Sequence, residues 1–193
     1  MAAKRSNDLD QVLAILQRHT SVNFNLYKQA TLLRRTARRM AVHKLDTLDA
    51  FAAYLRSHPA EVQALFDDLL IHVTDFFRDP VAFQFVKKDF LAPLFRRTKN
   101  GDAIRVWVPA CSSGEEVYSL AIILRELAEG AKSPGRPIQV FGTDLNETVQ
   151  AQARAATYPA ALVKKISSDR LRKYFDPVTG GFRVRTSLRD LCI

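Results

Sequence analysis

The chain has 193 residues, of which 47% are hydrophobic and 25% are charged, and its formal net charge is +9. This is the composition of a soluble globular protein, and no stretch reaches the roughly 20 apolar residues that a membrane helix needs. Two cysteines and four scattered histidines exclude a disulfide framework and indicate no metal site. We therefore expect a cytoplasmic protein without a metal and without membrane insertion. Its basic charge favours an acidic partner.

The first part of the sequence is predicted to be entirely helical and to form a domain over residues 1–75. No glycine occurs before Gly101, and apolar residues recur at helical spacing. Asp46 or Thr47 can cap one helix, and Pro59 suits the first turn of the next. The predicted helices cover residues 8–18, 26–43, 47–57 and 60–73.

After a connector at residues 76–100, in which Pro80 is predicted to start another helix, the pattern changes to α/β. Short β-rich runs are each followed by a helical segment, which is the pattern of a parallel sheet. We assign residues 101–193 to this α/β domain. The predicted strands are residues 103–109 and 138–144, the helices are 115–129 and 146–156, and "GFRVRTSL" and "RDLCI" are further strand candidates.

Polar side chains follow both predicted strands, at the edge where open parallel sheets bind ligands. The first strand leads into "ACSSGEE", which ends in Glu115 and Glu116, and the second strand ends at Asp144. Asp144 is well placed to accept hydrogen bonds from ribose hydroxyls. The turn has neither a GxGxxG nor a P-loop pattern, and its two acids would repel a pyrophosphate. S-adenosylmethionine, which has a ribose and a sulfonium but no phosphate, fits this site; the other interpretation is that the acids only favour a helix dipole.

Three separated motifs resemble the chemotaxis-receptor protein-glutamate O-methyltransferases of the CheR type. They are "VTDFFRDPVAF" (73–83), "VWVPACSSGEEVYSLAI" (106–122) and "VFGTDLNETVQAQARAATYP" (140–159). The segments "YKQATLLRRTARRM" and "VQALFDDLL" are similar to the helical N-terminal domain of that family. The likeness covers nearly the whole chain and is greatest to the versions in multidomain methyltransferase/methylesterase regulators.

The resemblance implies an all-helical domain followed by a Rossmann-like methyltransferase domain that binds S-adenosylmethionine. Members of the family continue well beyond "LRDLCI", with a further strand and further cofactor contacts. We therefore expect this chain to be truncated at its C-terminus and its sheet to be incomplete.

The resemblance also implies an activity and a set of site residues. The family methylates glutamate side chains of receptors and releases S-adenosylhomocysteine. Arg78 is expected near the methionyl carboxylate and the reacting centre, as a catalytic residue. Glu116 is expected near the amino group of the cofactor, which leaves Glu115 as a charge at the helix start. The cofactor-binding positions are then His72, which replaces a family asparagine, Thr74, Arg78, Glu116 and Asp144.

The segment "LRRTARRM" is predicted to form an amphipathic helix with a cationic face. At about 100° per residue, its four arginines fall within an arc of about 140°. Solvated faces ordinarily mix charge signs, and the resemblance implies that this helix recognises the glutamate-rich methylation region of a receptor. The arginines are Arg34, Arg35, Arg38 and Arg39, and the predicted apolar face carries Leu26, Ala30, Leu33, Ala37 and Met40.

Two other functions remain open from the sequence. The chain could be a catalytically silent receptor-binding module, in which the arginine helix does the binding. A weaker alternative is a nucleic-acid methyltransferase, because arginine-rich helices also contact phosphates. No nucleic-acid motif is present, and the aromatic residues Phe76, Phe77, Phe83 and Phe85 are expected in the core.

Overall fold

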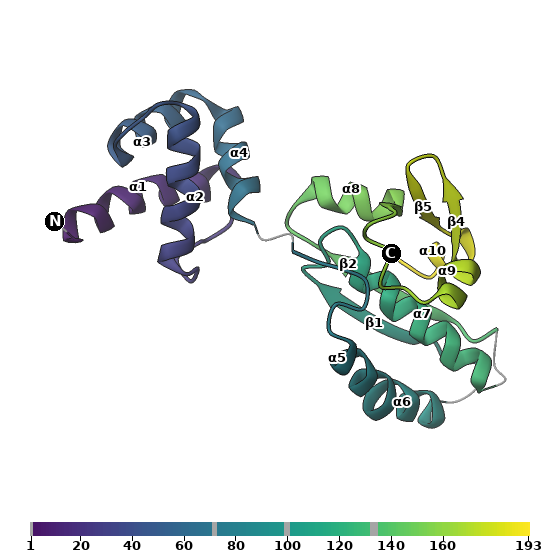
Figure 1. Cartoon of the computed structure of the whole chain (residues 1–193). Helices are drawn as coiled ribbons and strands as arrows, with labels where there is room; N and C mark the ends of the chain where they lie inside the picture. The colour runs from purple at the N-terminus through teal and green to yellow at the C-terminus, as the bar shows by residue number, and fades with distance from the viewer. Residues whose placement is uncertain (1, 71–72, 99–100, 132–134) are drawn as a thin grey trace. The chain divides into compact units, whose positions relative to one another are not determined.

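The computed structural model describes residues 2–70, 73–98, 101–131 and 135–193. The chain forms two compact units, Met1–Ile71 and His72–Ile193, drawn in Figure 1. Each unit has a hydrophobic cluster of its own. The first is all-helical and the second is a mixed α/β unit with small sheets, so the predicted fold class is confirmed. The helix that Pro80 starts, which the sequence assigns to a connector, belongs to the second unit.

The first unit contains four helices among the described residues: α1 (Ala2–Thr20), α2 (Gln29–Val42), α3 (Leu48–Ser57) and α4 (Pro59–Leu69). Thr47 caps α3, because its Oγ1 accepts a hydrogen bond from the Ala50 N–H at 3.2 Å. Pro59 occupies the first turn of α4, as predicted. Phe24, Phe51 and Leu65 are fully buried between these helices.

The buried face of α2 differs from the predicted apolar face. Leu32, Thr36 and Met40, spaced four residues apart, are buried against the other helices. Leu26 precedes the helix and is 98% exposed, and Ala30 is exposed too. Leu33 is half-buried and packs against the cluster, so the prediction holds at Leu33 and Met40 and is wrong at Leu26, Ala30 and Ala37. Beside this buried stripe, Arg35 and Arg39 pair with residues of α4, and a count of apolar residues does not register such contacts.

In the second unit, β1 (Ile104–Pro109) and β2 (Ile138–Thr143) pair in parallel over their whole length. They are connected through α7 (Glu115–Gly130), and α8 (Glu147–Ala155) follows β2, so all four predicted elements are confirmed. Ile104 and Ile138 are buried on one face of this sheet, whereas Trp107 on the other face is 67% exposed. Figure 1 shows α7 running along the sheet. This arrangement brings the carboxyl ends of both strands to one edge.

Three further strands form a separate antiparallel sheet in the order β3-β5-β4. Two strand predictions near the end of the chain need correction. Only "GFRV" is a strand, because Thr186–Arg189 forms helix α10, and "RDLCI" contributes a single parallel bridge from Cys192 to Val140. The sequence did not predict β3 (Thr157–Pro159), α9 (Ser168–Tyr174) and β4 (Phe175–Val178); β5 is Gly181–Val184. These elements have three to seven residues, too few for a clear hydrophobic period.

Helices α5 (Pro80–Phe85) and α6 (Ala92–Arg97) are joined by the π-helical segment η1 (Val86–Leu91) into one rod (Figure 1). The Ala92 N–H bonds to the Lys87 carbonyl, five residues back. Pro93 follows and has no N–H to continue the ordinary ladder. Phe85, predicted in the core, is 55% exposed and lies against the ring of Phe90 at 5.2 Å, because Phe83 and Val86 take the inward positions of the rod.

Candidate functional site

The turn after β1 is held against the end of β2 and packs against the last turn of α8. The Cys111 N–H donates to the Thr143 carbonyl at 2.9 Å. Ala110 and Ser112 have φ values of 54° and 50°, and Gly114 has 94°. At Gly114 a side chain would also clash, because a Cβ atom would lie 2.9 Å from the Cβ of Ala153. Glycine is therefore required here by both its backbone angle and its surroundings.

Asp144 joins the ends of the two parallel strands. One carboxylate oxygen accepts the Ser112 N–H at 2.8 Å and the other accepts the Asn146 N–H at 2.9 Å. A carboxylate has about four lone-pair positions, so about two remain for a ligand. The Ser112 Oγ is buried and has no hydrogen-bond partner among the described residues. Half-buried Asp144 and this unpaired hydroxyl suit a ligand that carries hydroxyl groups, as a ribose does.

The two glutamates at the start of α7 differ in environment. Glu115 is 1% exposed, and the Ser113 hydroxyl donates to its carboxylate oxygens at 2.8 and 3.0 Å. Burial, together with the charge of Asp75, raises the pKa of Glu115 above its ordinary value. Glu116 is exposed. Glu115 does stand at the helix start, but the prediction that it acts there merely as a dipole charge needs correction, because the group is buried and hydrogen-bonded.

The segment that carries Thr74 and Arg78 is anchored to the first turns of α7. The Phe77 N–H donates to the Ser119 Oγ at 3.1 Å, and that hydroxyl donates to the Glu115 carbonyl at 2.6 Å. Thr74 is half-buried, whereas Arg78 is exposed and donates to the carbonyl of Val73 in its own segment. His72, the remaining predicted cofactor contact, lies outside the described residues.

The structure therefore connects the segments that carry the predicted cofactor-binding residues. The 73–79 segment is bonded to α7, and the turn before α7 is bonded to Asp144. The side chains of Thr74, Arg78, Glu116 and Asp144 make no hydrogen bond with one another within the described ranges. Ser112 and Ser119 were missed by the sequence reasoning. Both lie inside the quoted motif, but nothing in a serine's local sequence shows that its hydroxyl is buried or which distant N–H it receives.

A pocket of about 290 Å³ lies beside the same turn, lined by Gly114 of the turn, Gly142 of β2 and residues of α7, α8 and the segment after α10. Cys111 and Cys192 line it, but Thr74, Arg78, Glu116 and Asp144 do not. Burial raises the pKa of both thiols, that of Cys192 to about 12. Neither cysteine is therefore a ready nucleophile at neutral pH. The pocket borders the turn after β1, but the predicted cofactor-binding residues do not line it.

The four arginines of α2 do not share one environment. The Arg39 Nε and Nη2 donate to the two carboxylate oxygens of Glu61 at 2.7 and 2.5 Å, and Glu61 is 7% exposed. Arg35 donates to the Asp68 carbonyl. Arg34 and Arg38 are exposed. The predicted cationic face of four arginines is thus reduced to two that point to solvent.

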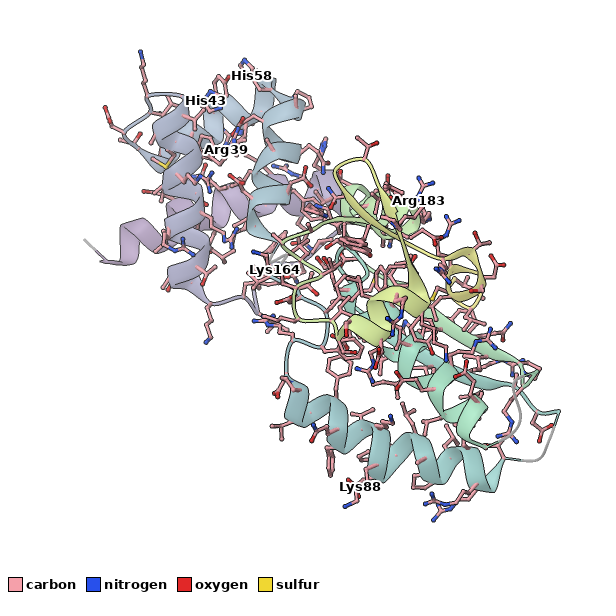
Figure 2. The ribbon with its side chains drawn as sticks, turned by 45° about the vertical axis from the view of Figure 1, so that its right-hand side comes forward. Arg39, His43, His58, Lys88, Lys164 and Arg183 are labelled. Atoms are coloured by element: carbon pink, nitrogen blue, oxygen red, sulfur yellow. The ribbon has the colours of Figure 1, made fainter. Side chains whose placement is uncertain are left out.

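An aromatic column extends this ion pair at one end of the helical unit. His43 Nε2 lies 2.8 Å from the Glu61 carboxylate, and its ring contacts Tyr54, which stacks on His58 at 3.8 Å. Figure 2 shows Arg39, His43 and His58 close together there.

In the parts of the chain that the structure describes, no helix is long and apolar enough to cross a membrane, and no group of three or more potential ligands could hold a metal ion.

Comparison with known proteins gives two family matches. Residues 7–70 match the all-alpha domain of CheR methyltransferases, and residues 72–193 match the S-adenosylmethionine-binding domain of the same enzymes. Together these two matches cover nearly the whole chain.

Individual relatives agree with these matches. An uncharacterized 104.1 kDa protein of Rhodobacter capsulatus is 30% identical over 96% of this chain and 19% of its own length. Chemotaxis protein methyltransferase 2 of Pseudomonas aeruginosa is 30% identical over 95% of this chain and 65% of its own. The chemotaxis protein methyltransferase of Salmonella typhimurium is 32% identical over 85% and 56%, respectively. The chain therefore spans less than two thirds of the length of each of these relatives.

Proposed function

The chain belongs to the CheR methyltransferase family, and we propose that it serves the transfer of a methyl group from S-adenosylmethionine to glutamate side chains of chemoreceptor-type signalling proteins. The product on the protein is a γ-methyl ester, and S-adenosylhomocysteine is released. Relatives named chemotaxis protein methyltransferases support this proposal.

The junction between Asp144 and Ser112 is the observation that carries the proposal. It leaves carboxylate lone pairs and one buried, unpaired hydroxyl at the carboxyl ends of two parallel strands. A nucleoside binds at this edge in open α/β sheets. The acids at the start of α7 disfavour a phosphate there, whereas they tolerate a cationic ligand. S-adenosylmethionine is a nucleoside with ribose hydroxyls, it carries no phosphate, and its sulfonium is cationic.

When bound, S-adenosylmethionine supplies a methyl group that is already activated by its sulfonium. The residues of the chain then have to hold and align the two partners, which is a task of proximity and orientation. In our proposal Asp144 accepts the ribose hydroxyls, Glu116 receives the amino group, and Thr74 and Arg78 close over the cofactor, with His72 as a further cofactor contact. Arg78 orients the methionyl carboxylate of the cofactor and the carboxylate of the substrate glutamate. A glutamate side chain has an ordinary pKa of about 4.3, so at neutral pH it attacks without a general base.

The receptor contact is proposed for the exposed arginines of α2. Arg34 and Arg38 can meet the acidic side chains of a receptor helix, whereas Arg35 and Arg39 are engaged within their own unit. Arg35 and Arg39 then contribute mainly by fixing the helix that presents the other two. The same surface would serve a binding module that lacks catalysis.

Replacement of Asp144 tests the cofactor site. We expect Asp144→Asn to weaken S-adenosylhomocysteine binding by about tenfold or more, because the ribose loses a charged acceptor whose hydrogen bonds are worth about 1.5–3 kcal/mol. Isothermal titration calorimetry on the folded 193-residue chain measures this. Asn retains one acceptor for the backbone N–H groups, and circular dichroism verifies the fold.

Glu147→Gln is the matched control, since Glu147 is an exposed acid in the first turn of α8 and its side chain makes no hydrogen bond or ion pair among the described residues. Equal affinity of Asp144→Asn and the wild type would contradict the site. If the folded wild-type chain binds no S-adenosylhomocysteine but binds a glutamate-rich receptor helix through Arg34 and Arg38, the binding module replaces the enzyme as the function of this chain.

A further inference from the structure

We infer that Arg170 is a positioning residue for Arg78, acting through the ring of Phe77. The inference rests on the proposed function, because it takes from there the position of Arg78 at the reacting centre. Arg170 itself belongs to α9, more than 90 residues later in the sequence. None of the family motifs in the sequence analysis includes it.

Phe77 has an unusual backbone conformation. Its φ is 48°, in the left-handed region that a bulky residue adopts only when its surroundings force it. Three contacts do so. The N–H is held by Ser119, the ring packs edge-on against Phe83 with a centroid distance of 5.4 Å, and Arg170 covers the ring. The direction in which the chain enters Arg78 depends on this conformation.

Arg170 is fixed in place over the Phe77 ring. Its guanidinium carbon lies 4.4 Å from the ring centroid, a cation–π distance. Its Nε and Nη2 donate to the two carboxylate oxygens of Glu126 at 2.7 and 2.8 Å. Lys87 of the rod donates to the same carboxylate at 3.2 Å. A two-pronged ion pair leaves the guanidinium little freedom, so its plane becomes part of the wall that keeps Phe77 in its strained conformation.

Lys173 provides a matched control on the same two helices. One turn further along α9, its Nζ forms an ion pair with Glu129 of α7 at 2.5 Å. Lys173 lies over the ring of Tyr174 and makes no ring contact with Phe77. Removal of Lys173 therefore deletes a bridge between α9 and α7 without touching the segment that carries Arg78.

The test compares Arg170→Met, Arg170→Lys and Lys173→Met in the full chain. The first readout is the affinity for S-adenosylhomocysteine, measured by calorimetry. The second is the rate at which trypsin cuts the bond after Arg78, followed by mass spectrometry at a temperature where all variants are folded. Cleavage there reports how firmly the 73–79 segment is held, whether or not the cofactor binds.

For Arg170→Met we expect about tenfold weaker binding, in the range of a partly buried cation–π contact, and faster cleavage after Arg78. Arg170→Lys should recover part of both losses, because it keeps the cation but not the two-pronged pair. Lys173→Met should match the wild type. If Arg170→Met unfolds, Glu126→Gln, which weakens the ion pair and leaves Arg170 present, replaces it.

Arg170→Met behaving like Lys173→Met in both readouts would overturn the inference. The failure of the proposed function looks different. In that case the wild type does not bind S-adenosylhomocysteine, while cleavage after Arg78 still separates the Arg170 variants from the Lys173 variant.

Discussion

Glu115 is a buried acid. The side chain that donates hydrogen bonds to its carboxylate is the neutral hydroxyl of Ser113. Within the described ranges no lysine, arginine or histidine forms an ion pair with it. Burial raises the pKa of Glu115, which means that folding favours its protonated form. The stability that this group contributes is therefore present below its ordinary pKa and is lost as the pH rises through the higher pKa of the folded state.

The stability of the Glu115→Gln variant should reflect this pH dependence. Relative to the wild type, the variant should gain stability as the pH rises from about 4 to 8, because Gln can accept the Ser113 hydrogen bond but carries no charge into the buried site. Thermal unfolding of both proteins across that pH range measures the difference. Glu116→Gln, at an exposed neighbouring position, should show little pH-dependent difference. A gain for Glu115→Gln that does not depend on pH would contradict the account.

At the scale of one element, α2 has an inner and an outer pair of arginines. Burial alone would raise the pKa of Glu61, but the hydrogen bonds from Arg39 and His43 outweigh it and the pKa is lowered. The stability from this carboxylate is thus present above its ordinary pKa and lost as the pH falls through the lower, folded value. The outer arginines, Arg34 and Arg38, take no part in this pair.

Arg39→Ala and Arg38→Ala should therefore separate stability from binding. Arg39→Ala leaves the Glu61 carboxylate buried without its main partner, and we expect a loss of about 2 kcal/mol, less than for a fully buried pair because the Arg39 side chain is 21% exposed. Arg38→Ala should change stability by less than about 0.5 kcal/mol. Urea unfolding at neutral pH measures both values.

The binding assay for this pair uses a glutamate-rich receptor helix as the probe. Arg38→Ala should bind this helix more weakly than the wild type does. The difference between the two proteins should disappear at high salt, because salt screens a solvent-exposed charge. Weaker receptor binding by Arg39→Ala alone, at full stability, would reverse the assignment of the two faces.

At the scale of the whole molecule, the two units have separate hydrophobic clusters. The buried residues of the first cluster all lie between Leu9 and Leu70, and those of the second between Phe76 and Leu188. Trp107, the one tryptophan in the sequence, lies in the second unit. Its fluorescence therefore reports on that unit alone, whereas circular dichroism reports the helices of both.

Phe51→Ala tests whether the units unfold separately. Phe51 is fully buried in the first cluster, and deletion of a buried phenyl ring costs about 3–5 kcal/mol. We expect the helical signal of the first unit to be lost at lower urea concentration, while the Trp107 fluorescence transition keeps its midpoint. If both signals shift together, the units unfold cooperatively as one.

Much of the site's framework was predictable because its signals are local. Hydrophobic runs and the turn between them gave β1, α7 and β2, and the topology of a parallel pair then required the Ser112 turn and Asp144 to meet at one edge. The two adjacent acids, Glu115 and Glu116, argued against a ligand with a phosphate at this edge. What remained hidden was the difference between Glu115 and Glu116, adjacent residues of the same type, since their burial depends on how α7 is rotated on the sheet.

The sequence by itself determined the two-part architecture and the family motifs, because helical period, glycine distribution and motif order are properties of neighbouring residues. Only the tertiary structure decided which charges are internal. Arg39 meets Glu61 and Arg170 meets Phe77 across 22 and 93 positions of the chain. Such contacts form when helices pack, and the energy of a polar pair depends on the burial that packing creates. No local pattern records that burial, which is why the division of the α2 arginines into an inner and an outer pair and the wall around Phe77 emerge only from the folded chain.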